Sequence, residues 1–206
     1  MSQFFEINPE NPQDRLIQQA GDIIRAGGVI VYPTDSGYAL GCQLGDKAAM
    51  QRISKIRDLA AKHKFTLLCR HLSDVGKYAR FGTPVFRILK ANTPGPYTFV
   101  LHASRDVPKR LLHPKRRTIG LRIPENRIAL ALLAELQEPM LTTSLILPED
   151  SFPLSDPLEI KEQLEKKVEL IIDGGFCGTE PTTVVDLLED VPKVLRQGKG
   201  DISPFL

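Results

Sequence analysis

The sequence predicts an α/β sandwich built around a mixed sheet. Helical and strand-like patterns mostly alternate along the 206 residues, as they do in α/β folds. Residues 29–32 form a continuous apolar run, which is typical of a strand buried on both faces. The last predicted strands follow one another without a helix, which indicates some antiparallel pairing. The length and a hydrophobic content of 42% fit a single domain.

Periodicity and capping residues set the individual elements. Asp46 is a candidate N-cap for the second helix, and Ser73 and Thr83 are candidate caps for two short ones. The longer helices are predicted over 11–28, 46–57, 126–136 and 156–166. Strands are predicted over 29–32, 65–69, 97–102, 118–123, 140–144, 168–172, 182–188 and 193–196.

Composition excludes several classes of protein. No apolar run approaches the 18 or so residues that span a membrane, and the first residues lack the basic and apolar regions of a signal peptide. The three scattered cysteines form neither a disulfide framework nor a metal-binding cluster. We therefore expect a cytoplasmic protein with no membrane partner and no metal site of its own.

Positive charge is concentrated in the middle of the chain. Residues 52–127 hold 18 Lys and Arg against 4 Asp and Glu, although the whole chain has a net charge of only +2. Such an excess predicts a surface for phosphate or nucleic acid. The alternative is a set of solvated lysines whose charge is cancelled in the fold by the acidic C-terminal third.

Two segments could hold a small polar substrate. A buried strand ends at Pro33 and is followed by the hydroxyl groups of Thr34 and Ser36, at the place where α/β folds bind ligands; the alternative is a plain turn. In 118–124, strand alternation places Thr118, Gly120 and Arg122 on one face. An arginine in an apolar strand needs an anionic partner, so we expect Arg122 to bind a carboxylate, with a salt bridge to Glu125 as the alternative.

Two further segments could bind a ligand or have a purely structural role. Lys55 and Arg57, followed by Lys62, His63 and Lys64, could clamp a triphosphate or form a solvated helix end. The stretch 92–98 holds two prolines around a glycine and predicts a stiff turn. The sequence contains no phosphate-binding GxxxxGK[ST] loop and no GxGxxG, HExxH, CxxC or GxSxG motif, so a serine hydrolase or a zinc enzyme has no support.

Taken in order, seven segments resemble the YrdC/Sua5/YciO family, most closely its YciO branch. They are 27–41, Lys55-x-Arg57, 94–96 with the strand that follows, 118–124, 142–144, 181–186 and 195–198. The resemblance covers about 10–200, which is then the core of one YrdC-like domain over 1–206. It implies a twisted, open, mixed sheet with a concave basic face flanked by helices.

The resemblance also implies an activity. Active family members make L-threonylcarbamoyladenylate from L-threonine, bicarbonate and ATP, with Mg²⁺ carried on the ATP, and they supply the t6A modification of tRNA adenosine 37. Partners implied are tRNA or double-stranded RNA. The residues implied to bind the nucleotide are Lys55, Arg57, Thr118, Ser144 and Arg196. Those implied to bind threonine are Thr34, Ser36, Arg122, Thr142 and Thr183.

Two departures from the family pattern indicate a diverged synthase. The family pairs KxR with a later SxN, but here the second element reads Ser144-Leu145-Ile146, so an amide is replaced by an apolar side chain. Segment 65–69 also lacks the Pro-Leu and histidine of many members. Strand alternation places Ile146 on the same face as Ser144; the alternative is that Ile146 faces the core. The alternatives are a non-catalytic RNA-binding protein, or an enzyme that acts on a threonylcarbamoyl group already present on tRNA.

Overall fold

The computed structural model describes residues 1–58, 65–112 and 116–206. Its strands are β1 (Gln3–Glu6), β2 (Ile30–Pro33), β3 (Tyr38–Gln43), β4 (Thr66–Leu68), β5 (Ala79–Arg80), β6 (Tyr97–Ala103), β7 (Thr118–Arg122), β8 (Met140–Ser144), β9 (Leu170–Asp173), β10 (Thr183–Asp186) and β11 (Lys193–Arg196). Its helices are α1 (Asp14–Arg25), α2 (Lys47–Ile56), α3 (Leu72–Tyr78), α4 (Thr83–Asn92), α5 (Arg127–Leu136) and α6 (Pro157–Leu164). The predicted α/β class is confirmed.

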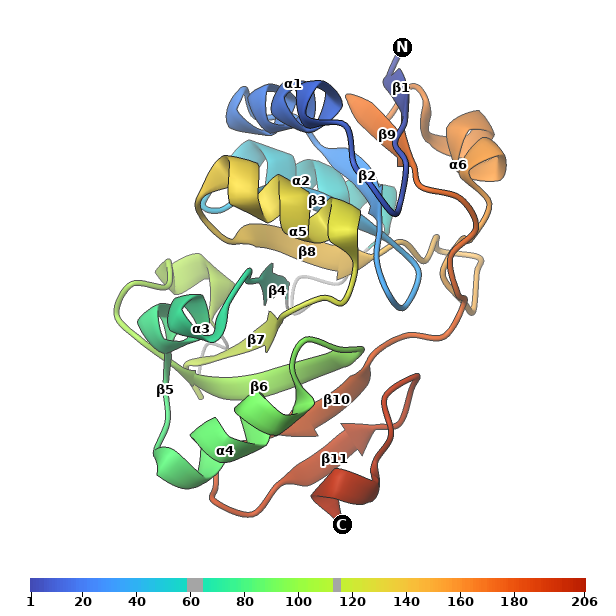
Figure 1. Ribbon diagram of the computed structural model, residues 1–206. Coiled ribbons are helices and arrows are strands. Elements are labelled where there is room, and N and C mark those ends of the chain that lie inside the picture. Colours follow the sequence, from blue (N-terminus) through green and yellow to red (C-terminus); the bar gives the residue numbers. More distant parts are fainter. Residues whose placement is uncertain (59–64, 113–115) are drawn as a thin grey trace.

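All the described strands belong to one mixed sheet. Its order is β1-β9-β2-β3-β8-β4-β7-β6-β10-β11, and β5 pairs with β6 outside this path. The sheet contains parallel pairs such as β4 with β7 and antiparallel pairs such as β3 with β8. The last two strands pair antiparallel, as their adjacency predicts. The sheet runs through the whole molecule (Figure 1).

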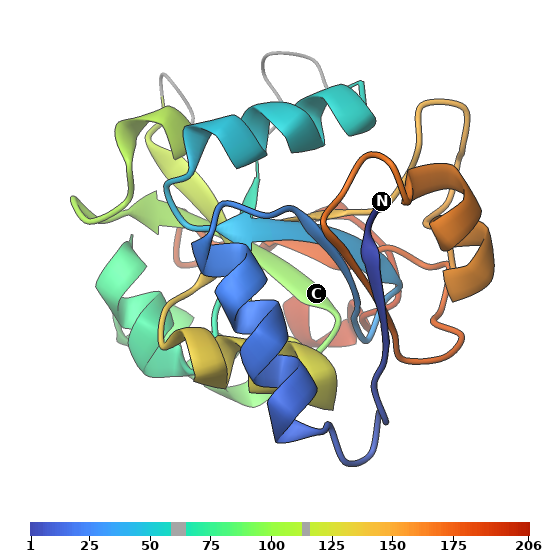
Figure 2. The same ribbon diagram turned by 90° about the horizontal axis from the view of Figure 1, so that it is seen from above.

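Two apolar cores lie on the two faces of the sheet. Val29 and Val31 pack with α2 in one core, whereas Ile30 and Tyr32 pack with α1 and α5 in the other. Seen from above, α2 lies on one side of the sheet and α1 and α5 lie on the other (Figure 2). The apolar run therefore forms a strand buried on both faces, as predicted.

The sequence-based predictions missed three strands, among them the two-residue β5, and misplaced two caps. The hydroxyl-rich turn after Pro33 is short, and β3 then returns antiparallel to β2. The edge strand β1, which pairs parallel with β9, was not predicted either. Asp46 caps α2 as predicted, since its side chain accepts from the Ala49 N–H at 2.9 Å. The N-caps of α3 and α4 are instead His71 and Gly82, two residues and one residue ahead of the predicted positions, respectively.

The C-terminal segment folds back onto the sheet. Phe205 is buried, and its ring packs edge-on against Tyr97 and Phe99 at 5.5 and 6.2 Å between centroids. Upstream of it, the Tyr97 hydroxyl donates to the Asp201 carbonyl at 3.0 Å. These contacts fix the chain between Arg196 and Phe205, and so determine where Lys199 lies.

Three features bear on chemistry and location. All three cysteines are free thiols, and two of them are buried. Among the described residues, no group of three or more His, Cys, Asp or Glu side chains is placed to hold a metal ion. Within the same part of the chain, no helix has the length and apolar character needed to span a bilayer.

Candidate functional site

A cavity of about 330 Å³ lies over the central strands and is lined by residues of β3, β8, β4, β7, β6 and β10. Three arginines line it, Arg57, Arg122 and Arg196. Seven hydroxyl groups join them, from Thr66, Thr98, Thr118, Thr142, Thr143, Ser144 and Thr182. No Asp or Glu is among its described lining residues. Cations and hydroxyl donors without acidic groups are typical of an anion-binding site.

The strand register brings these hydroxyls together. Thr66 of β4 lies opposite Gly120 of β7 on one side and Thr142 of β8 on the other. Gly120 in turn lies opposite Val100 of β6. A Cβ at Gly120 would come within 3.1 Å of the Thr66 hydroxyl oxygen, so glycine leaves the cavity floor open. The predicted alternation of Thr118, Gly120 and Arg122 on one face is confirmed, because all three line the cavity.

Arg57 and Arg196 approach the cavity from opposite sides. Arg57 follows α2 and donates from Nε to the Ile146 carbonyl at 2.9 Å and from Nη1 to the Thr143 hydroxyl at 2.6 Å. Arg196 on β11 donates from Nη2 to the Thr182 carbonyl at 2.8 Å. Burial lowers the pKa of both guanidinium groups, which nevertheless stay charged at neutral pH. Within the described chain neither pairs with a carboxylate.

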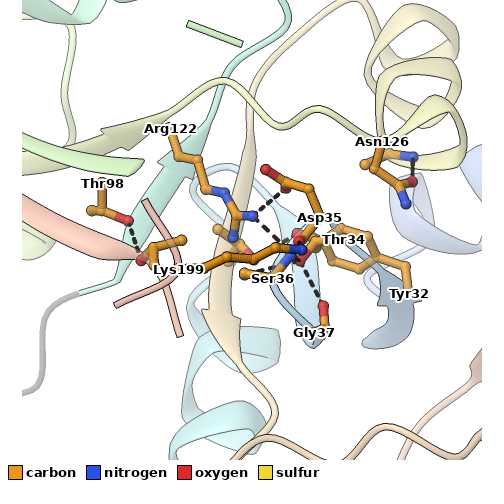
Figure 3. A network of polar contacts seen from close by, with 12 residues as sticks. Tyr32, Thr34, Asp35, Ser36, Gly37, Thr98, Arg122, Asn126 and Lys199 are labelled. Carbon is orange, nitrogen blue, oxygen red and sulfur yellow. Dashed lines mark hydrogen bonds and ion pairs between the residues drawn. The ribbon is translucent and has the colours of Figure 1, made fainter. Parts of the chain in front are cut away.

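Arg122 has a different partner. Its Nη2 donates to Asp35 Oδ1, and also lies 3.4 Å from the Thr34 hydroxyl (Figure 3). The two charged side chains are only 7% and 9% exposed. The predicted alternative of a salt bridge to Glu125 does not form; Asp35, which sequence reasoning passed over, provides the carboxylate instead. Asp35 Oδ2 and Arg122 Nε are buried and have no partner among the described residues.

The turn between β2 and β3 holds Asp35 in place. The Thr34 hydroxyl donates to the Gly37 carbonyl at 2.6 Å and lies 3.2 Å from the Ser36 N–H. Gly37 has a φ of +148°, and a Cβ there would come within 2.8 Å of the Gly178 carbonyl oxygen, so only glycine fits. Lys199 Nζ, from the C-terminal segment, donates to the Asp35 carbonyl (Figure 3).

Tyr32 contacts the cavity wall through Thr142. Its hydroxyl and that of Thr142 lie 2.6 Å apart in a buried hydrogen bond. Burial raises the pKa of Tyr32 to about 12, so the phenol stays protonated at neutral pH. The hydroxyl of Thr142 is thereby fixed on the cavity wall.

The structure brings together six of the ten predicted site residues and separates four. The six that line the cavity are Arg57, Thr118, Arg122, Thr142, Ser144 and Arg196. Lys55 is exposed and lines a separate hollow with Arg52, Ile56 and Lys167. Thr34 and Ser36 hold the turn behind Arg122 and are not among the lining residues. Lys62, His63 and Lys64 lie outside the described residues.

Thr183 points away from the cavity. Its hydroxyl donates to the Gly200 carbonyl at 2.6 Å, while its neighbours Thr182 and Val184 line the cavity. Thr182, which the sequence analysis did not single out, lines the cavity in this segment, as alternation with Thr183 would have indicated once one of the two was placed. Sequence reasoning also missed the hydroxyls of Thr66, Thr98 and Thr143. Ile146 does line the cavity beside Ser144, as predicted.

Comparisons with known proteins show the family and the fold. Residues 22–198 match the family model Sua5_yciO_yrdC, described as "Telomere recombination". The YciO protein of Escherichia coli is 60% identical over the full length of both chains, and its crystal structure superposes with a TM-score of 0.96. The threonylcarbamoyl-AMP synthase of Mus musculus is 30% identical over 198 residues, covering 86% of this chain and 69% of the mouse protein.

A more distant relative was solved with a bound amino acid. Sua5 of Pyrococcus abyssi, solved as a complex with L-threonine, is 27% identical and superposes with a TM-score of 0.86. The superposition covers 95% of this chain but only 57% of the archaeal one. The chain therefore spans little more than half the length of that protein.

Proposed function

The chain belongs to the Sua5/YciO/YrdC family, and on that premise we propose that its cavity binds ATP and L-threonine and forms L-threonylcarbamoyladenylate for the t6A modification of tRNA. Homology to threonylcarbamoyl-AMP synthases supports this proposal. The observation that carries it is the lining of three arginines and seven hydroxyl groups, with no acidic side chain among its described members. Such a lining complements a polyphosphate and a carboxylate together.

The three arginines would bind different parts of the substrates, because only Arg122 is paired with a carboxylate. Among the described residues, Arg57 and Arg196 donate only to carbonyl and hydroxyl oxygens, so their charges remain available to the phosphates of ATP. Thr118 and Ser144 would donate further hydrogen bonds to the nucleotide. Arg122 is compensated by Asp35 and would hold the threonine carboxylate, with Thr142 beside it.

The remaining predicted contacts act from outside the cavity. Thr34 and Ser36 hold the turn that carries Asp35, and Thr183 fixes the C-terminal segment through Gly200. Lys55 would meet only a ligand that extends to its separate hollow. Mg²⁺ would enter bound to the phosphates of ATP, because the described lining offers hydroxyl groups but no carboxylate to hold the ion alone.

The reaction would use the cavity as an anion clamp. L-threonine and bicarbonate supply the carbamate, whose oxygen displaces pyrophosphate from the α-phosphorus of ATP. Both the attacking and the leaving group are anionic, so catalysis depends on positive charge and hydroxyl donors fixed around the phosphates. Ile146 places a hydrocarbon side chain in this lining, and we expect it to slow the reaction relative to a member with an amide there.

Pyrophosphate release tests the proposal. The protein is incubated with ATP, L-threonine and bicarbonate, with and without tRNA, and release is compared when each substrate is omitted. We expect release that requires both L-threonine and bicarbonate and falls at least tenfold in Arg196→Ala. Release that is independent of L-threonine would contradict the synthase proposal.

A second function, RNA binding without efficient catalysis, is favoured by a separate observation. Five exposed cations lie on α3, β5, α4 and the loop before α3: Arg70, Lys77, Arg80, Arg87 and Lys90. Within the described chain none of them pairs with a carboxylate. Unpaired surface cations bind the phosphates of RNA by shape and charge rather than by sequence.

The proposed location is the cytoplasm. The free thiols and the proposed ATP and tRNA all fit a cytoplasmic protein.

A further inference from the structure

A second cavity, of about 730 Å³, adjoins the central one on the same face of the sheet. The two meet where His102 of β6 lies opposite Thr118 of β7. Val100 and Val184 line the central cavity, and His102 and Asp186, each two positions further along the same strand, line the second. The lining residues of the second cavity are His102, Arg116, Asp186, Leu188, Glu189, Val191, Pro192 and Lys193.

Part of this lining is apolar and open to a ligand. Leu188, Val191 and Pro192 all lie in the loop that joins β10 to β11. Val191 is 78% exposed, so its side chain is not used by the core. An apolar surface of this kind can pack against the face of a flat ring.

Two carboxylates line the same cavity without neutralising its cations. Asp186 lies opposite Lys193 in the strand register, yet within the described chain neither Asp186 nor Glu189 forms an ion pair. Asp186 Oδ1 accepts from the Leu188 N–H at 2.9 Å. The Glu189 carboxylate has no such partner in the part of the chain that the structure describes. Both of its oxygens therefore remain as acceptors for a ligand that donates.

Positive charge surrounds the second cavity. Arg116 and Lys193 line it, and Arg80 of β5 lies opposite His102 in the strand register. Arg80 is one of the exposed cations on α3, β5 and α4, so that cationic surface continues up to this cavity. Segment 104–117, which ends beside the cavity, holds six Lys and Arg against one Asp. Cations at this density attract a phosphate chain.

A nucleotide in RNA has the three properties that this lining complements. Its phosphates are anionic, its base has apolar faces, and the edge of the base carries hydrogen-bond groups. Guanine is the standard RNA base whose pairing edge presents two adjacent N–H donors, from the ring nitrogen and the amino group. Two parallel donors match the two oxygens of one carboxylate. The cations extend over β5 and α4, which is further than one nucleotide reaches and favours an RNA chain over a free nucleotide.

We infer that the second cavity binds one unpaired base of an RNA chain and that Glu189 selects guanine there. The inference rests on the RNA-binding function proposed above and is independent of the synthase reaction. It goes beyond that function, because surface cations alone bind RNA without regard to sequence. A carboxylate that accepts from the edge of a base adds a preference for one base.

Two RNAs that differ in a single amino group test the inference on the unmodified protein. One is oligo(U) with one internal guanosine, and the other carries inosine at that position, which lacks the amino group of guanosine. We expect the guanosine RNA to bind roughly 10- to 150-fold more tightly in fluorescence anisotropy at low salt, because one hydrogen bond to a carboxylate is lost with inosine. Equal affinities would overturn the inference.

Glu189→Gln tests which side chain makes the selection. The amide has one acceptor and one donor in place of two acceptors, so it cannot pair with both donors of guanine. We expect the ratio of the two affinities to fall toward one. The ratio is the measurement, because loss of a negative charge strengthens the binding of both RNAs. An unchanged ratio in this variant would overturn the assignment to Glu189.

The matched control is Glu162→Gln, which makes the same change of one charge elsewhere. Glu162 is exposed on α6, which packs against β9 near the opposite edge of the sheet from β10 and β11 (Figure 1). We expect this variant to keep the wild-type ratio, and a lower ratio would show that net charge rather than Glu189 sets the preference.

Two further outcomes separate the inference from the functions it adjoins. Binding of GMP as tightly as the guanosine RNA would overturn the assignment to an RNA chain. If neither RNA binds at low salt, the RNA-binding function falls and the inference falls with it. If both RNAs bind equally well, the RNA-binding function stands and the inference alone is overturned.

Discussion

Ile146→Asn tests whether one apolar side chain limits the chemistry. The Ile146 side chain lines the cavity, and its own carbonyl accepts from Arg57 Nε at 2.9 Å. An amide at this position would lie beside a ligand held by Arg57 and could both donate and accept. The gain is bounded by one hydrogen-bonding group, about 1.4–3 kcal/mol, so the rate should rise by roughly 10- to 150-fold.

The assay measures pyrophosphate release and melting temperature on the same preparation. Ile146→Ala removes the bulk without adding an amide, so it should not reproduce the gain. Leu145 is fully buried in the core, and Leu145→Asn should lower stability by about 1–3 kcal/mol, or about 2–12 °C, with no gain. If Ile146→Asn behaves like Leu145→Asn, with a lower melting temperature and unchanged release, the reasoning about this position is refuted.

Three further predictions follow from the charges and the cysteine thiols. Arg57→Ala and Arg196→Ala should each weaken ATP binding about 10- to 150-fold in calorimetry, whereas Lys161→Ala on α6 should not; unchanged affinities would exclude the phosphate role. Burial raises the pKa of Cys42 to about 12 and of Cys177 to about 11. The unfolded chain therefore loses these protons first as the pH rises, and stability should fall above about pH 9. Melting temperatures from pH 7 to 11 check this fall, and Cys42→Ala should flatten it; a flat wild-type profile would contradict it. RNA affinity should fall linearly with salt on logarithmic axes, and the double variant Arg87→Gln, Lys90→Gln should reduce the slope by about 1.4–1.8. An identical slope would remove α4 from the RNA surface.

Local patterns predicted what depends on local geometry. Alternation placed Thr118, Gly120 and Arg122 on one face because successive side chains of a strand point to opposite faces. The same rule placed Ile146 with Ser144, although β8 ends at Ser144. Asp46 was recognised as a cap because an N-cap needs only its own side chain and the next turn.

Pairings between distant segments were beyond this reasoning. Asp35 meets Arg122 across 87 positions of sequence, and Lys199 meets Asp35 across 164. Nothing in the turn itself distinguishes the carboxylate that pairs from one that faces solvent. Lys55 and Arg57 lie only two positions apart, yet α2 ends between them and the chain turns, so the first is exposed and the second reaches the cavity.

The partners of the three arginines explain how a positive cavity can exist inside a stable fold. Burying a cation without a partner is costly. Arg57 and Arg196 meet that cost with carbonyl and hydroxyl oxygens, which satisfy donors but leave the charge in place. Arg122, the most buried of the three, is given a carboxylate instead. Arg57 and Arg196, whose partners are neutral, therefore keep a positive charge that can attract an anionic ligand. The positive charge of Arg122 is instead balanced by its acidic partner.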